Sequence, residues 1–72
     1  SPESETVDRQ LLQKTHAEIQ RLPVRLREAL ILVAIDGRSQ NEVADIMGVS
    51  EKAVESLVYR ARKALKEKIS RA

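Results

Sequence analysis

Apolar side chains recur every three or four positions along almost the whole chain, which is the spacing of an amphipathic helix. In the first such stretch the apolar stripe consists of Val7, Leu11, Leu12, Thr15 and Ile19. Pro23 suits the first position of a second helix, where its missing N–H costs nothing. Together with the start and stop signals described next, the spacing predicts a compact all-α domain of four helices, over residues 6–21, 23–36, 39–47 and 50–69.

The signals at the helix ends are specific. Gly37 can take the left-handed conformation that closes the second helix. Ser39 and Glu42 have the spacing of a capping box, which predicts the start of the third helix. Gly48 ends that helix, and Ser50 is the expected N-cap of the fourth, with Glu51 close to its positive end.

The third and fourth helices have the residues that a helix-turn-helix requires. Its two helices cross steeply across a short turn, so the first needs a small residue at the crossing, which Ala44 supplies. Gly48 tolerates a positive φ in the turn, and Val49 can fill the gap behind it. Val54 and Leu57 then face inward from the second helix. This combination predicts a helix-turn-helix that binds DNA.

In such a motif the second helix lies in the major groove, and its N-terminal turns are nearest the bases. We expect Arg60, Arg62 and Lys63 to contact phosphates, and the start of the third helix, with Ser39 and Gln40, to donate to a phosphate. The candidate DNA-binding residues are Ser39, Gln40, Ser50, Lys52, Glu55, Ser56, Tyr59, Arg60, Arg62 and Lys63.

Glu55 is the unexpected member of this set, because a carboxylate is repelled by phosphates. Two interpretations stay open. Glu55 accepts a hydrogen bond from a cytosine amino group, or it pairs along the helix with Lys52, Tyr59 or Arg62 and contacts no base.

Charge and composition narrow the function. Residues 1–36 hold five basic and six acidic side chains, whereas residues 37–72 hold eight and five, within a net charge of +2. A basic end on a small domain is typical of proteins that bind a polyanion, although cations also suit a helix C-terminus. The absence of cysteine fits a cytoplasmic setting, and no apolar run is long enough to enter a membrane as a span.

Nothing in the sequence favours an enzyme. His16 is the single histidine, it has no cysteine or second histidine with which to bind a metal, and we expect it at the surface. The sequence has no glycine-rich phosphate loop, and its serines and acids are accounted for by caps and solvated faces. We therefore expect no catalytic residue, no metal and no cofactor.

Several of these segments resemble region 4 of bacterial sigma factors, above all those of the extracytoplasmic-function group. The resemblance covers about residues 19–68. It rests on Leu22-Pro23 before a helix, on the run from Asp36 to Ala44, on Met47-Gly48-Val49-Ser50, and on Ala53 to Leu57 followed by Arg60-Ala61-Arg62-Lys63-Ala64-Leu65.

The resemblance implies that the domain recognises the −35 element of promoter DNA and so directs RNA polymerase to specific promoters. It places base and backbone contacts at Glu55, Ser56, Tyr59 and Arg60, with Lys52 nearby. It also implies that another surface binds the β flap of RNA polymerase or an anti-sigma factor. Many relatives have Lys or Arg where this chain has Glu55, and Arg where it has Leu57, so the promoter sequence does not carry over.

The second helix is apolar on almost every side, so it is either buried centrally or offers a second face to a partner. Ile31, Leu32 and Ile35 are our candidates for that partner surface, and the core of a tightly wrapped bundle is the alternative. We expect residues 1–72 to be one domain from a longer chain, with residues 1–5 disordered.

Two other functions stay open. One is a LuxR-type output domain, which would bind DNA as a dimer through its last helix. Here, however, the basic helix continues from the recognition helix without a break, which favours the sigma factor. The other is a protein-interaction module that no longer reads DNA, a possibility that Glu51 and Glu55 keep open.

Overall fold

The computed structural model describes residues 15–70, and in this range every regular element is helical. A first helical segment over residues 15–21 leads to α2 (Val24–Leu30), which continues into a short π-helix, η1 (Ile31–Ile35). After a loop come α3 (Gln40–Met47) and the long α4 (Glu51–Ser70). The predicted all-α fold with a helix-turn-helix is confirmed, while the part of the first predicted helix at 6–14 and the segment 1–5 lie outside the described residues.

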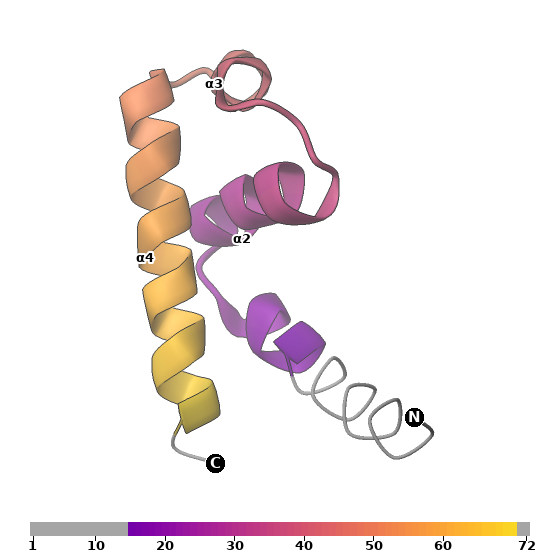
Figure 1. The fold of residues 1–72 in the computed structure, drawn as a ribbon, viewed down its shortest axis with the longest axis vertical. Helices are drawn as coiled ribbons and strands as arrows, with labels where there is room; N and C mark the ends of the chain where they lie inside the picture. The colour runs from indigo at the N-terminus through magenta and orange to yellow at the C-terminus, as the bar shows by residue number, and fades with distance from the viewer. Residues whose placement is uncertain (1–14, 71–72) are drawn as a thin grey trace.

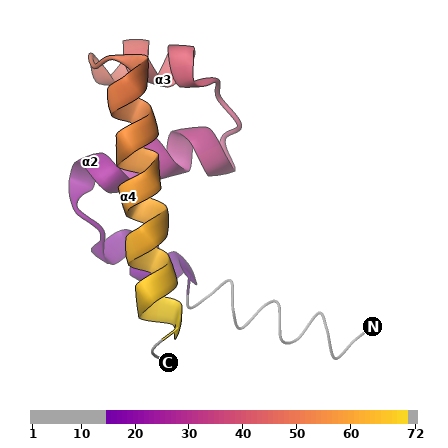
Figure 2. The same ribbon diagram turned by 60° about the vertical axis from the view of Figure 1, so that its left-hand side comes forward.

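The other helices are all arranged along α4 (Figures 1 and 2). α3 lies beside its first turns, α2 crosses its middle, and residues 15–21 lie beside its last turns. Its 20 residues correspond to a length of about 30 Å, long enough for one helix to support all the others.

The core fills the space between α4 and the other helices. Ala29, Val43, Val54 and Ala61 have no exposed surface. These are small side chains at the crossing points, and they allow the helix axes to approach closely. The remaining core residues are Ile19, Leu22, Leu30, Ala44, Val58 and Leu65. Of the two positions of α4 predicted to face inward, Val54 is buried and Leu57 is half-buried, and Val58, Ala61 and Leu65 of the same helix are buried as well.

The predicted second helix over residues 23–36 is present, and its second half is a π-helix. The Asp36 N–H donates to the Ile31 carbonyl at 2.9 Å, and the Arg38 N–H donates to the Leu32 carbonyl at 3.0 Å. These bonds span one residue more than the α-helix and the usual helix-closing turn would use. Gly37, with φ of 71°, reverses the chain at this point as predicted.

A side chain also fixes the turn between residues 15–21 and α2. Arg27 Nη1 donates to the Gln20 carbonyl oxygen at 3.1 Å, which satisfies one of the free carbonyls at the end of the first helix. Leu22 is buried in the same turn, and Pro23 precedes the first residue of α2.

Candidate nucleic-acid interface

The turn between α3 and α4 has the geometry of a helix-turn-helix. Gly48 takes the left-handed conformation, with φ of 68° and ψ of 36°. Its N–H donates to the Asp45 carbonyl at 3.3 Å, and the Val49 N–H donates to the Ala44 carbonyl at 3.0 Å. This pair of bonds is a Schellman motif, which closes α3 and leaves the next helix crossing it. Ala44 is buried and Val49 half-buried, as the motif predicts.

Side chains fix the start of both helices. The Ser39 hydroxyl accepts from the Glu42 N–H at 3.1 Å, and the Ser39 N–H donates to Glu42 Oε1 at 3.4 Å, so the predicted capping box is present. The Ser50 hydroxyl accepts from the Ala53 N–H at 3.0 Å and caps α4. The two caps fix the direction in which α3 and α4 begin. They thereby fix the direction in which the exposed sides of the two helices face.

The candidate DNA-binding residues of α4 are all exposed. Lys52, Ser56, Tyr59 and Lys63 recur at the three- and four-residue spacing that places side chains on one helix face, opposite the core. Tyr59 is 66% exposed, and tyrosine is a residue type enriched at binding interfaces. Glu55, Arg60 and Arg62 flank this row and are exposed as well. We call these seven residues the α4 face.

Ser39 and Gln40 lie at the start of α3, on the same end of the molecule as the first turns of α4 (Figure 1). Arg38 precedes them and was not among the predicted residues. Its Nη1 lies 3.5 Å from Glu42 Oε2, and 47% of its side chain is exposed. The signal in the sequence that could have added Arg38 to the candidate DNA-binding residues was its position directly before the capping box.

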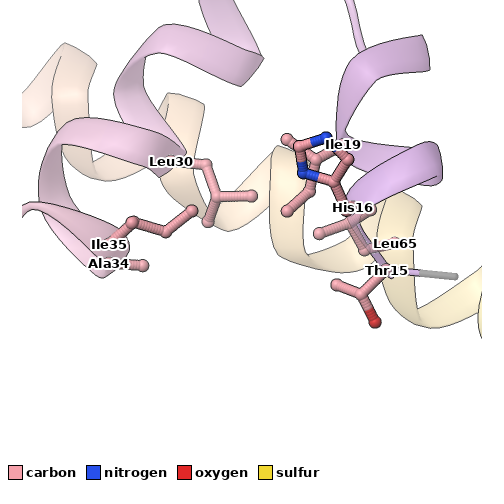
Figure 3. A pocket seen from close by; sticks show the side chains of 7 residues that line it. All are labelled: Thr15, His16, Ile19, Leu30, Ala34, Ile35 and Leu65. Carbon is pink, nitrogen blue, oxygen red and sulfur yellow. The ribbon is translucent and has the colours of Figure 1, made fainter. Parts of the chain in front are cut away.

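The three residues predicted to face a partner are separated by the structure. Ile31 and Leu32 are half-buried and pack against the core, whereas Ile35 is 64% exposed. Ile35, Ala34 and Leu30 form one wall of an open apolar groove of about 510 Å³. The other wall consists of Thr15, His16 and Ile19, together with Leu65 of α4 (Figure 3).

The groove has few side chains that could catalyse a reaction or bind a metal ion. His16 is exposed at its rim, as predicted, and the other lining groups are aliphatic apart from the Thr15 hydroxyl. Within the described range, no group of three His, Cys, Asp or Glu side chains could hold a metal ion, and no polar side chain is buried. Every helix between residues 15 and 70 is too short or too polar to cross a membrane.

Comparison with known proteins decides the family. A family model described as "Sigma-70, region 4" matches residues 12–65. The chain belongs to the sigma-70 region 4 family. RNA polymerase sigma factor CnrH of Cupriavidus metallidurans is 39% identical over 61 residues, which is 85% of this chain and 32% of that protein. The ECF RNA polymerase sigma-E factors of Salmonella typhimurium and Escherichia coli K12 are each 36% identical over 69 residues, 96% of this chain and 36% of theirs.

These matches confirm the resemblance to region 4 of extracytoplasmic-function sigma factors and do not favour the LuxR-type alternative. The region 4 domain spans about a third of the length of the curated relatives it matches. The residues that would contact DNA or a partner are not identified by these matches, so the candidate residues stay predictions.

Proposed function

We propose that this chain is the part of an extracytoplasmic-function sigma factor that recognises the −35 promoter element in the cytoplasm. The helix-turn-helix carries the proposal. Two capped helices meet at a closed turn, and the second presents an exposed face of cations, hydroxyls and one tyrosine. Membership in the region 4 family supports the same function. The chain has no role as an enzyme in this proposal.

The proposal divides the face by distance from the start of α4. Lys52, Glu55 and Ser56 lie in its first two turns and read base edges, because the N-terminal turns of a recognition helix lie deepest in the major groove. Tyr59 and Arg60 follow at the edge of the groove, where they reach both bases and backbone. Arg62 and Lys63 bind phosphates, and so does the start of α3, at Ser39 and Gln40.

Replacing Tyr59 and Arg60 together by Ala tests direct reading of sequence. We expect the wild-type chain to enrich a common element from a library of random duplexes, and the double variant to lose that enrichment while it still binds DNA through its phosphate contacts. The matched control is Lys66→Ala with Glu67→Ala, two exposed residues further along α4. Equal enrichment by the wild type and the Tyr59/Arg60 variant would contradict the proposal.

The proposal also gives the apolar groove beside Ile35 to a protein partner. In the assembled sigma factor we assign it to the β flap of core RNA polymerase, with an anti-sigma factor as a competitor for the same surface. The support is the apolar lining of the groove together with the exposure of Ile35, since exposed aliphatic surface of this kind marks binding sites.

Replacing Ile35 by Glu tests this assignment. We expect at least a ten-fold loss of affinity for core RNA polymerase in a pull-down titration, because a charge would have to be buried at the contact. Selection of DNA sequences should stay unchanged. Val24→Glu is the control, since Val24 is also an exposed aliphatic residue, at 56%, but does not line the groove. Equal polymerase affinity for wild type and Ile35→Glu would remove the groove from the proposal.

A further inference from the structure

Glu55 belongs to the α4 face, where a carboxylate is hard to explain. It is exposed in the second turn of α4, between Lys52 and Tyr59. In a DNA complex it would lie among the negatively charged phosphates that the surrounding cations attract. Its repulsion has to be offset by a favourable contact, or the residue weakens binding for no gain.

The structure gives Glu55 none of the roles that other glutamates have. Glu42 completes the capping box of α3, and Glu18 lies 3.6 Å from Arg21. Glu51 lies in the first turn of α4, where a negative charge stabilises the positive end of a helix. Glu55 lies one turn further on, beyond the reach of that effect.

Pairing along the helix does not occupy Glu55 either. Lys52 and Tyr59 are its neighbours three and four positions away, and Arg62 lies two turns further on. All three belong to the described part of the chain, and there none forms an ion pair or a hydrogen bond with the Glu55 carboxylate. The carboxylate is therefore available to accept hydrogen bonds from DNA.

The chemistry of a carboxylate limits what it can read. At neutral pH it accepts hydrogen bonds and donates none. In the major groove, guanine presents two acceptors and thymine one acceptor and a methyl group, so both repel it. Adenine presents an amino donor directly beside an acceptor. Cytosine presents only an amino donor, at N4. It is therefore the base that can donate to a carboxylate without an acceptor of its own beside the donor.

We propose that Glu55 determines specificity by selecting a cytosine in the promoter element that the α4 face reads. The inference rests on the proposed function and adds the identity of one base to it. In the complex, Lys52 and Arg60 attract the phosphates and so offset the repulsion that the Glu55 carboxylate adds. Glu55 thus contributes selectivity, and the cations contribute affinity.

Selection from random duplexes with the wild-type chain and two Glu55 variants tests the inference. We expect the wild type to prefer cytosine at one position by about ten-fold, which corresponds to one good contact. Glu55→Gln should move the preference at that position to adenine, because an amide both donates and accepts. Glu55→Arg should move it to guanine. Glu67→Gln, which removes the same charge from an exposed position near the end of α4, should leave all preferences unchanged.

Each outcome separates this inference from the function on which it rests. A change of preference at one position, with the rest of the element retained, supports the role of Glu55. An unchanged element in both Glu55 variants overturns the inference and leaves promoter recognition standing, and so does a uniform rise in affinity for all sequences. Selection by the wild type of a base other than cytosine at the position that the variants alter also overturns it. If the wild type binds but enriches no element, the proposed function itself fails.

Discussion

At the scale of single residues, the site depends on a few local hydrogen bonds. Ser39 and Ser50 each use a hydroxyl to satisfy a backbone N–H at a helix start, and Gly48 adopts a backbone conformation that other residues adopt at a cost. All three residues are exposed, yet together they determine where α3 ends and in which direction α4 leaves the turn. The position of the α4 face follows from them.

Gly48→Ala should destabilise the domain by about 1 kcal/mol. An added Cβ would meet no atom within 4 Å, so the cost arises from the positive φ of 68° and not from a clash. Gly48→Asn should cost less, because asparagine tolerates the left-handed region better than alanine does. Urea unfolding followed by circular dichroism measures both. The explanation is wrong if the alanine variant is as stable as the wild type, or if the asparagine variant is the less stable of the two.

At the scale of elements, the caps were predictable and the π-helix was not. The capping box involves residues three positions apart, so the sequence contains all of its information. In η1, by contrast, α and π hydrogen bonding differ by one residue in register and not in composition. The choice between them cannot be made from local composition, and η1 lies against α3, whose residues follow it only after a loop.

The same distinction applies to the two candidate surfaces. Exposure of the α4 face follows from the periodicity of one helix, and the structure agrees with it residue by residue. The groove does not follow from any local pattern, because its walls come from Ile19, Leu30 and Leu65 on three separate elements. For that reason the sequence grouped Ile31 and Leu32 with Ile35, although only Ile35 of the three lines the groove.

Ala29→Leu should test how closely α2 approaches α4. Ala29 in α2 and Ala61 in α4 have no exposed surface, so three additional carbon atoms at Ala29 would push the helices apart. We expect a loss of about 2 kcal/mol in the free energy of unfolding, measured by urea titration. Ala34→Leu is the matched control, because Ala34 is exposed at the groove and has room for the larger side chain. Similar stability for the two variants would mean that the crossing is looser than the structure has it.

At the scale of the whole molecule, the balance of charge changes from the start of α4 to its end, whereas the core lies on one side of α4 along most of its length. Acidic and basic side chains nearly balance over the first half of the chain, and the excess of cations follows Arg60. Affinity and specificity are therefore assigned to different parts of one helix. In the proposed function, the mixed first turns read bases, and the cations beyond them hold phosphates. Under the proposed function, we expect such a domain to bind DNA weakly when it is isolated.

This arrangement predicts how salt affects binding. Arg62→Ala and Lys63→Ala should each reduce the affinity for every duplex by the same factor, whether or not it contains the selected element. Each should also reduce the slope of log affinity against log salt concentration by about one unit, because one phosphate contact and its released counterion are lost. Fluorescence anisotropy over a range of salt concentrations measures both effects.

Arg21→Ala is the control for the salt experiment. Arg21 is an exposed cation that pairs with Glu18. It belongs to the segment 15–21, which lies beside the last turns of α4, at the opposite end from α3 (Figure 2). Its removal changes the net charge by the same amount and should leave the slope almost unchanged. If Arg21→Ala reduced the slope as much as Lys63→Ala, binding would depend on net charge alone. If Lys63→Ala weakened binding to the selected element more than to random duplexes, Lys63 would belong to the residues that read bases.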